Sequence, residues 1–543
     1  MIKQMSGEPS QNQFDVVVIG AGINGAGIAR DAARRGLRVL LLDKGDVGGG
    51  TSSWSTRLIH GGLRYLEHGE IGLVRESLRE RECLLNIAPH LVRPLPILVP
   101  IYKNARRGPW TIRAGMFAYN ALSFDKTLPR HRLLSQAETL RSVPALNPSG
   151  LLGAAIYFDA QVEFAERLVL ENALSAIEHG AKVATYARVE RLVIAGQSVR
   201  GVEFTVELTG ARRSAQARVV INAAGPWIDQ LLEKAGASSS RLIGGTKGSH
   251  IIVAPFSGAP PQALYVEAEM DHRPFFIIPW NHNYLIGTTD IRYDGDLDHV
   301  EIDDKEIEYL LGETNRVIPQ AKLTREQILY TYSGVRPLPL TSDNDEQSIT
   351  RRHFIKQNPL LKNLFSIVGG KLTTYRSLAQ ETVDLIFKQL ARRSPKCTTA
   401  QEPLPGAATA TATAFATFAR NFKQESRLAE AMSHRLLRIY GTRSPLILSL
   451  VQQDSSLAEV FDLESGAIAA EVVFAFKFEL AQTLSDCLLR RTMVGLNSTC
   501  GLNAAEAAAG IAQKHLGWSS GRTDEEVAEY TKYVKRFRPS ETG

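Results

Sequence analysis

The sequence predicts an α/β protein in which a Rossmann-like nucleotide-binding domain is joined to a mixed-sheet domain and a helical C-terminal domain. A strand, a glycine-rich turn, a helix and a second strand succeed one another within residues 15–43. Short strand-like stretches recur between 183 and 290, and the chain beyond 414 has a helical pattern. Because 543 residues exceed one hydrophobic core, we expect two or three domains.

The first turn has the spacing of a dinucleotide-binding loop. Gly20, Gly22 and Gly25 follow the apolar strand 15–19 and precede a helix. The first glycine permits the tight turn, the second lets the backbone approach a pyrophosphate, and the third lets the helix pack close to the strand. Asp43 ends the second strand, where a carboxylate accepts a ribose hydroxyl and disfavours the 2′-phosphate of NADP. This unit therefore predicts a bound dinucleotide.

Three further segments favour FAD over NAD. A loop of small polar residues at 48–56 can lie along an extended cofactor and donate hydrogen bonds to it. Residues 364–371 form a second strand–glycine–helix junction, whose helix N-terminus can stabilise negative charge on a reduced flavin. A third strand, which ends at Ala224 and Gly225, can close over the cofactor. Together these segments predict FAD held by parts of the chain that are distant in sequence.

The strand and helix patterns divide the chain into three domains and a linker. Pro403, Pro405 and an Ala/Thr run are typical of a linker. The expected division is a discontinuous FAD-binding domain at 14–95, 150–235 and 350–395, a substrate-binding domain at 96–149 and 236–349, a linker at 396–413, and a helical domain at 414–543.

The composition is that of an ordinary globular protein, with 44% hydrophobic and 22% charged residues. A net charge of +6 suits an anionic substrate or an anionic membrane surface, and there is no Lys/Arg tract of the kind that binds nucleic acid. The four cysteines have no CxxC spacing, so we expect neither a metal site nor a disulfide. No apolar run approaches the ~20 residues that span a bilayer, and the N-terminus lacks a signal peptide, so we expect a cytoplasmic protein.

Long motifs along the chain resemble those of the FAD-dependent, respiratory glycerol-3-phosphate dehydrogenases. The resemblance extends from about residue 14 to 390 and, more weakly, to DCLLRRT at 486–492. The motifs are GAGINGAGIARDAARRGL (20–37), TSS (51–53), LIHGGLRYLEHGE (58–70), RERECLLNIAPHL (79–91), KGSHIIV (247–253), GTTD (287–290), YSGVRPL (332–338) and GGKLTTYR (369–376).

The resemblance implies a fold and a reaction. The FAD-binding domain and its mixed-sheet substrate domain would resemble those of D-amino-acid oxidase. The enzyme would oxidise sn-glycerol 3-phosphate to dihydroxyacetone phosphate by hydride transfer from C2 to FAD N5. It would then pass the electrons to a membrane quinone while bound peripherally to the inner face of the cytoplasmic membrane. A second copy of the chain is a further partner left open.

The same motifs imply the site residues. A phosphate dianion needs cations, and Arg64, Arg336 and Lys371 lie in three separate motifs, with Tyr65 as a hydroxyl donor. His250 and His60 are the candidates for the base that takes the C2 hydroxyl proton, and His60 is the one that could instead contact the flavin. We expect His250 to be the base, with an ordinary pKa of about 6.5, and Arg336 to share in catalysis. The residues expected to bind FAD are Gly20, Gly22, Ile23, Asn24, Gly25, Asp43, Thr51, Ser52, Ser53, His60, Gly61, Gly62, Ala224, Gly225, Gly370, Lys371, Leu372 and Thr373.

Three other readings stay open. A soluble glycerol-3-phosphate oxidase would use the same site with O₂ as acceptor. The larger subunit of an anaerobic complex would carry a C-terminal cysteine cluster, which Cys487 and Cys500 do not make. A catalytically silent FAD-binding partner protein would have lost the substrate cations.

A membrane-contacting helix is a separate hypothesis, for which an ordinary packed helix with a charged rim is the alternative. Basic residues beside apolar ones suit an interfacial helix. The residues concerned are Lys103, Arg106, Arg107 and Arg113, beside Trp110, Ile112, Met116 and Phe117.

Overall fold

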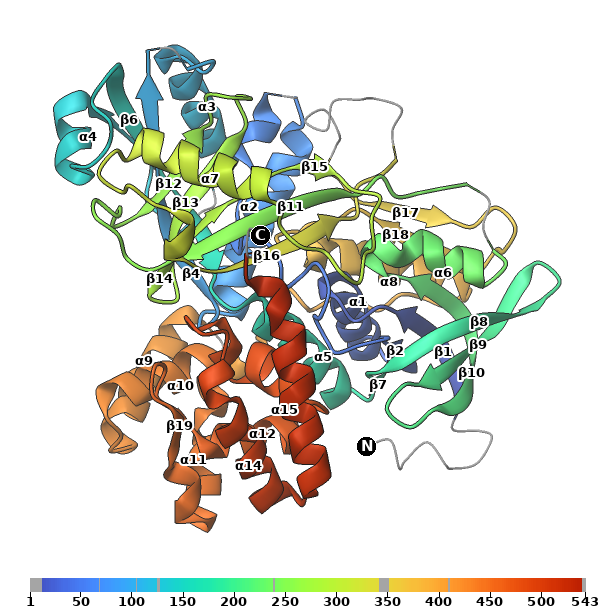
Figure 1. The fold of residues 1–543 in the computed structure, drawn as a ribbon. Helices are drawn as coiled ribbons and strands as arrows, with labels where there is room; N and C mark the ends of the chain where they lie inside the picture. Colours follow the sequence, from blue (N-terminus) through green and yellow to red (C-terminus); the bar gives the residue numbers. More distant parts are fainter. Residues whose placement is uncertain are drawn as a thin grey trace.

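The computed structural model describes residues 12–67, 69–103, 105–124, 127–237, 240–340, 351–408 and 411–539. Two sheet-containing parts lie side by side, and in the view of Figure 1 the helical C-terminal part lies below the left-hand one and beside the right-hand one. The predicted α/β fold with a helical C-terminal domain is confirmed.

The first sheet has the parallel core that the glycine motif predicts. Strands β18, β10, β1, β2 and β7 are paired in parallel, and β17 adds an antiparallel edge. Apolar residues on both faces of β1 are buried, as expected for a strand covered on two sides. The bounds are β17 (Phe354–Gln357), β18 (Leu364–Val368), β10 (Ala211–Asn222), β1 (Gln13–Ile19), β2 (Val39–Leu42) and β7 (Lys182–Ala184).

Helices cover one face of this sheet and an antiparallel extension covers the other. Helix α1 (Ile23–Arg34) packs against α5 (Ala165–Glu178) and α8 (Tyr375–Gln389). On the opposite face, β8 (Ala187–Ala195), β9 (Ser198–Val206) and α6 (Ile228–Lys234) enclose a second apolar cluster.

The second sheet has ten strands and is mostly antiparallel. Strand β6 belongs to it, although the expected division placed 150–235 in the FAD-binding domain; the boundary at 349 and 350 lies outside the described residues. The helices beside this sheet are α2 (Ile71–Ile87), α3 (Pro109–Leu122), α4 (Gln136–Ser142) and α7 (Asp304–Val317). Its strands are β15 (Ile291–Arg292), β11 (Thr246–Val253), β14 (Asn283–Gly287), β13 (Pro274–Trp280), β12 (Ala263–Glu267), β4 (Val92–Tyr102), β6 (Leu151–Val162), β3 (Leu58–Ile59), β16 (Ile328–Arg336) and β5 (Arg132–Ser135).

The segment expected as a linker is packed against the first part over its described residues, which leave out 409 and 410. Leu404 is fully buried, and its N–H donates to Ile87 O over 2.9 Å. Arg30 donates to Glu402 O over 2.7 Å. The described part of this segment is therefore anchored to the preceding fold at residues 402–404.

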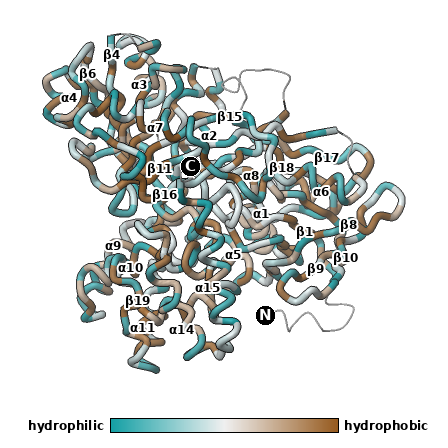
Figure 2. Tube along the Cα trace, viewed as in Figure 1, coloured by the Kyte–Doolittle hydropathy of each residue, from teal (hydrophilic) through white to brown (hydrophobic). Residues whose placement is uncertain are grey.

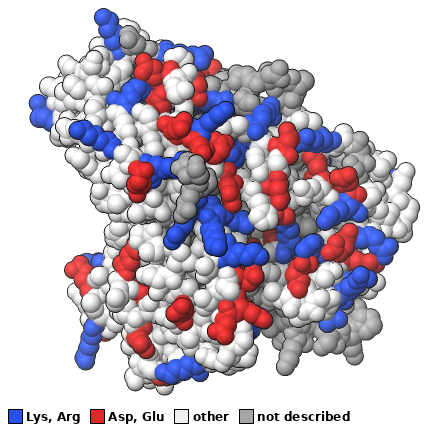
Figure 3. Space-filling view, in the orientation of Figure 1, with Lys and Arg blue, Asp and Glu red and all other residues white. Residues whose placement is uncertain are grey.

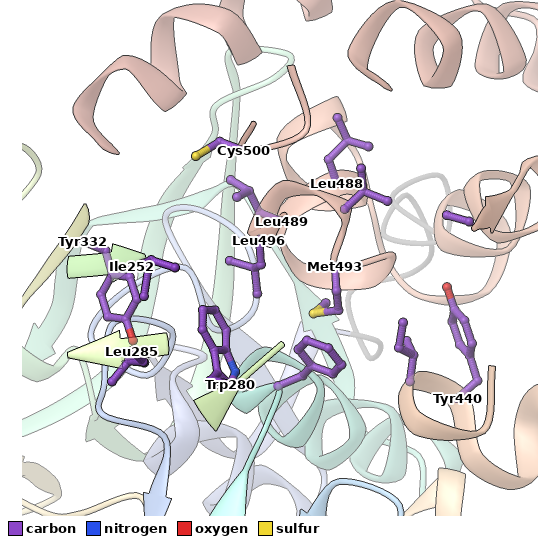
Figure 4. Packing of buried hydrophobic residues seen from close by; sticks show 14 of the residues in the cluster. Ile252, Trp280, Leu285, Tyr332, Tyr440, Leu488, Leu489, Met493, Leu496 and Cys500 are labelled. Atoms are coloured by element: carbon purple, nitrogen blue, oxygen red, sulfur yellow. The ribbon is translucent and has the colours of Figure 1, made fainter. Parts of the chain in front are cut away.

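The C-terminal part is helical apart from one two-stranded hairpin. A hydrophobic cluster runs continuously from the second sheet into these helices, and Figure 4 shows Leu489 and Leu496 facing Trp280 and Tyr332. In Figure 2 hydrophilic colours follow α15, of which only Tyr530 and Val534 are buried. The bounds are α9 (Ala412–Glu425), α10 (Glu430–Tyr440), α11 (Ser444–Gln453), α12 (Ala469–Phe478), α13 (Leu484–Asp486), α14 (Ala505–Leu516), α15 (Ser520–Val534), β19 (Val460–Asp462) and β20 (Ala467–Ile468).

Candidate active site

A cavity of about 1800 Å³ lies where the three parts of the fold meet. Residues directly after β1, β2, β10 and β18 line it, which is the edge of a parallel sheet where ligands bind. On the face drawn in Figure 3, Lys and Arg side chains gather near the centre, where these parts join. Basic residues lining the cavity include Lys44, Lys234, Lys477, Arg522 and Arg536. A cavity with such a rim attracts anionic ligands.

The glycine turn directs the N-terminus of α1 toward this cavity. Gly20 has φ +103°, and a Cβ on Gly25 would lie 1.8 Å from Gly20 O. Only glycine therefore permits this approach of helix to strand. The Ile23 N–H donates to Ser52 Oγ over 3.0 Å, so the 48–56 loop lies across the helix N-terminus. The N–H groups and dipole of this helix end suit a pyrophosphate.

Asp43 lies beside the same turn. Its Oδ2 accepts from Ala21 N–H at 2.6 Å and its Oδ1 from Gly45 N–H at 2.8 Å. Burial raises the pKa of Asp43 above its ordinary value despite these hydrogen bonds. The carboxyl group is therefore held rigidly at the end of β2, where a ribose hydroxyl is expected.

The second glycine junction lies next to the first, as the sequence predicts. Asn24 Nδ2 donates to Gly369 O over 3.3 Å, and the His60 N–H donates to Thr373 Oγ1 over 3.1 Å. Gly370 has φ +96°, and a Cβ there would lie 2.7 Å from Asn24 Nδ2. Two glycine-bordered helix ends, which are 345 residues apart along the chain, thus share one cavity.

Three residues expected to bind the cofactor lie behind the cavity wall. Gly25 packs against the Gly20 carbonyl, Ser53 Oγ donates to Gly48 O over 2.6 Å, and the Gly61 N–H donates to Tyr119 Oη over 2.9 Å. They shape the loops that carry their neighbours. The other expected residues line the cavity: Gly20, Gly22, Ile23, Asn24, Asp43, Thr51, Ser52, His60, Gly62, Ala224, Gly225, Gly370, Lys371, Leu372 and Thr373.

Two arginines share one carboxylate in the cavity wall. Arg336 Nη1 donates to Asp290 Oδ1 at 2.9 Å, and Arg351 Nη2 donates to Asp290 Oδ2 at 3.0 Å. Although burial alone would raise it, Arg336 and Arg351 hold the pKa of Asp290 at about 2. Arg351 Nη1 is buried and has no hydrogen-bond partner among the described residues. Sequence reasoning missed Arg351 and gave no role to Asp290, although GTTD was among the recognised motifs.

Further cations complete this cluster. Lys371 Nζ lies 4.1 Å from the centre of the Tyr65 ring and donates to Ser77 Oγ over 3.2 Å. Burial lowers the pKa of Lys371 from its ordinary value. Burial and the neighbouring Arg351 lower that of Arg64. Desolvated cations of this kind favour an anionic ligand that replaces their lost hydration.

His250 lies on β11, and one of its ring nitrogens has no hydrogen-bond partner among the described residues. Its Nε2 lies 2.9 Å from Thr56 Oγ1, and when Nε2 donates this hydrogen bond, Nδ1 is left as a proton acceptor. Nδ1 is buried without a hydrogen-bond partner among the described residues. Burial, Arg336 and Arg57 hold the pKa of His250 well below 6.5, so the expected ordinary value is wrong. The sequence pattern around His250 does not predict that its side chain is buried.

The residues present fit FAD. The glycine turn provides a cradle in which Cβ atoms would collide with the backbone, and Asp43 lies beside it. Asn24 Oδ1 and Trp227 Nε1 are buried and lack hydrogen-bond partners among the described residues, and both side chains line the cavity. Such orphaned groups are costly unless a ligand satisfies them.

Comparisons with known proteins agree with this geometry. Residues 15–385 match the model of the FAD dependent oxidoreductase family, and residues 397–523 match that of the C-terminal domain of alpha-glycerophosphate oxidase. A glycerol-3-phosphate dehydrogenase of Synechocystis sp. is 46% identical over 97% of this chain and 98% of its own. A D-erythritol 1-phosphate dehydrogenase of Brucella abortus is 39% identical over 89% of this chain and 95% of its own.

A solved structure is similar along the whole chain. The glycerol-3-phosphate dehydrogenase of Bacillus halodurans, solved with FAD, has a TM-score of 0.83 and 28% identity, covering 100% of this chain and 99% of that one. The predicted cofactor and family are confirmed: the chain is an FAD dependent oxidoreductase and belongs to the family of FAD-dependent glycerol-3-phosphate dehydrogenases.

Proposed function

We propose that this protein oxidises sn-glycerol 3-phosphate to dihydroxyacetone phosphate and passes the electrons to a membrane quinone. The observation that carries the proposal is the cluster of Arg336, Arg351 and Lys371 in the same cavity as His250 and the FAD-binding turn. When bound, FAD supplies the two-electron oxidant that takes the C2 hydride at N5.

The cation cluster is suited to anchoring the phosphate group. An arginine fork matches phosphate oxygens with two donors, and Asp290 orients the guanidiniums of Arg336 and Arg351. Lys371 and Arg64 add positive charge, and Tyr65 supports Lys371 through its ring. A dianion held here would leave the carbon chain to extend toward His250.

His250 is suited to taking the proton of the C2 hydroxyl group. In the balanced reaction C2 loses a hydride to the oxidant and its hydroxyl loses a proton, which leaves a ketone. Nδ1 of neutral His250 accepts that proton, and the positive charge of Arg336 stabilises the oxygen as negative charge develops on it. A bound phosphate dianion would partly neutralise the positive charge of Arg336, which lowers the pKa of His250, and would so make His250 a stronger base.

Substrate choice is tested by comparing three alcohols in anaerobic flavin reduction. We expect the highest kcat/KM for sn-glycerol 3-phosphate, a lower value for D-erythritol 1-phosphate, which is one carbon longer, and negligible reduction by glycerol, which has no phosphate. A higher kcat/KM for D-erythritol 1-phosphate would overturn the substrate assignment. Reduction by glycerol as fast as by the phosphate would overturn the role of the cation cluster.

The acceptor is tested by comparing a soluble quinone analogue with O₂ under turnover. We expect quinone reduction to be much faster than peroxide production. Peroxide formed at the rate of substrate oxidation would instead support the oxidase alternative.

An exposed aromatic surface on and beside α3 supports the proposal of peripheral binding to the inner face of the membrane. Trp110 is 78% exposed, Phe117 is 72% exposed, and Phe124 just beyond the helix is 78% exposed. Exposed aromatic residues beside Arg106 and Arg113 suit an interface with anionic lipids. Among the described residues, no helix has the length and apolar character needed to cross a bilayer.

Three residues of that hypothesis are corrected. Ile112 and Met116 point inward and are 8% and 1% exposed, because they pack in the core below α3. Arg107 is ion-paired with Glu67 and Glu267 rather than presented to a surface. The membrane surface we propose therefore consists of Trp110, Phe117, Phe124, Arg106 and Arg113.

Vesicle sedimentation tests this surface. Replacing Trp110 and Phe117 by Ala should weaken binding to vesicles that contain anionic lipid. The same change at Leu463, which is 90% exposed on the C-terminal hairpin, should not. Equal binding by both variants would contradict the proposed surface.

A further inference from the structure

The DCLLRRT motif directs two consecutive arginines of the C-terminal part at one carboxylate of the FAD-binding part. Arg491 Nη1 and Nη2 each donate to Asp46 at 2.7 Å, and Arg490 Nε donates to it at 2.5 Å. Both arginines lie on the π-helical turn Cys487–Arg491, in which the Thr492 N–H donates to Cys487 O. Such turns are rare in proteins, and those that occur are often found at functional sites.

This ion-pair cluster is buried, with Asp46 and Arg490 at the cavity wall. Asp46 is 4% exposed, Arg490 is 5% exposed and Arg491 is not exposed. Although burial alone would raise it, Arg491 and Arg490 hold the pKa of Asp46 below its ordinary value. Removing one partner of a buried pair leaves a charge without compensation, so the cluster resists displacement of any member.

Asp46 controls the loop that crosses the N-terminus of α1. It lies between Asp43 and Ser52, the two residues whose side chains accept hydrogen bonds from the glycine turn and from α1. The Gly49 N–H donates to Asp46 O over 3.1 Å, and the Gly48 N–H donates to Ala21 O over 3.0 Å. The conformation of residues 44–52 is therefore tied to Asp46 at its centre.

We infer that the C-terminal domain is part of the FAD-binding apparatus, because Arg490 and Arg491 hold Asp46 and thereby the 44–52 loop in the conformation that retains FAD. Asp46 and Arg490 line the cavity, whereas Arg491 does not, so Arg491 is a positioning residue that acts through Asp46. The inference rests on the FAD-dependent family and is independent of the substrate.

The chain offers a matched control for this cluster. Glu479 of the C-terminal part is a second buried carboxylate held by two arginines, Arg167 of α5 and Arg443. Arg167→Met removes one of the two, just as Arg491→Met removes one of the two that hold Asp46. Both changes break a buried ion pair between the same two parts. The Glu479 carboxylate accepts from Arg167 and Arg443, and Arg167→Met costs Arg491 a 3.5 Å hydrogen bond to its backbone O while its side-chain contacts with Asp46 stay in place.

The experiment measures the rate at which diluted holoenzyme releases FAD, from the rise in flavin fluorescence. A urea midpoint from circular dichroism measures global stability for each variant. We expect Arg491→Met to release FAD on the order of 10- to 100-fold faster than the parent protein, the range seen in metal sites when a group that orients a metal ligand is removed. Arg167→Met should release FAD at the parent rate with a similarly lowered urea midpoint.

Two results would overturn the inference. One is an unchanged release rate in Arg491→Met; the other is equal acceleration in Arg491→Met and Arg167→Met, which would indicate general loosening of the interface. If Arg491→Met does not fold, Arg491→Lys replaces it, because lysine keeps the positive charge but cannot donate to both Asp46 oxygens from two nitrogen atoms, as Arg491 does. That variant should release FAD faster than the parent, and parent-like release would again contradict the inference.

Discussion

Replacing Arg351 by Met should weaken substrate binding while leaving FAD in place. Arg351 lines the cavity and donates to Asp290 with one nitrogen, and its buried Nη1 has no hydrogen-bond partner among the described residues; we expect a phosphate oxygen to be that partner. A hydrogen bond involving a charged group contributes about 1.5–3 kcal/mol. At about 1.4 kcal/mol per factor of ten, loss of one such bond raises KM roughly 10- to 140-fold.

The assay is anaerobic stopped-flow reduction of the flavin over a range of glycerol 3-phosphate concentrations. Arg352→Met is the matched control, because Arg352 is the adjacent residue and does not line the cavity. Its KM should stay at the parent value. A parent-like KM in Arg351→Met, or an equal rise in both variants, would refute the assignment of Arg351 to the phosphate.

Two further predictions follow from the same cavity. Gly25→Ala should purify with little FAD, because its Cβ would lie 1.8 Å from Gly20 O. Gly312→Ala is the control and should retain FAD, because no atom lies within 4 Å of the added Cβ. Full flavin content in Gly25→Ala would contradict the described turn. His250 acts as a base only when neutral and its pKa is lowered, so its fall in kcat/KM should lie well below pH 6.5, separate from the fall near pH 6 caused by protonation of the substrate phosphate. In His250→Asn the fall due to His250 should disappear and the rate of flavin reduction should drop about 10²- to 10⁴-fold. The fall near pH 6 due to the substrate phosphate should persist in both proteins. A fall in kcat/KM centred at pH 6.5 that disappears in the variant would contradict the lowered pKa.

The cofactor cavity was predictable because its constraints are local. Glycine spacing after an apolar strand dictates a turn and a helix end, and two such junctions in one chain indicate one extended ligand. The sequence did not distinguish Ser52, which lines the cavity and accepts from the Ile23 N–H, from Ser53, whose hydroxyl donates to Gly48 O. Neighbouring hydroxyl groups in a loop point in directions set by the surrounding fold.

The rest of the site depends on contacts between distant segments. Asp290 acquires its role because two arginines, 46 and 61 residues further along the chain, meet it. The pKa of His250 is set by burial and by Arg336, which no local pattern encodes. The pairing of Asp46 with Arg491 joins residues 445 apart in the sequence. Motif resemblance marked several of these segments without indicating what their side chains do.

The most direct test of the central proposal is anaerobic titration of the purified protein with sn-glycerol 3-phosphate. The protein should show a flavin absorption band that bleaches on addition of substrate, with one dihydroxyacetone phosphate formed per flavin reduced. A protein that carries FAD but is not bleached by glycerol 3-phosphate would contradict the proposed function, and one that purifies without flavin and does not bind added FAD would contradict the cofactor site itself.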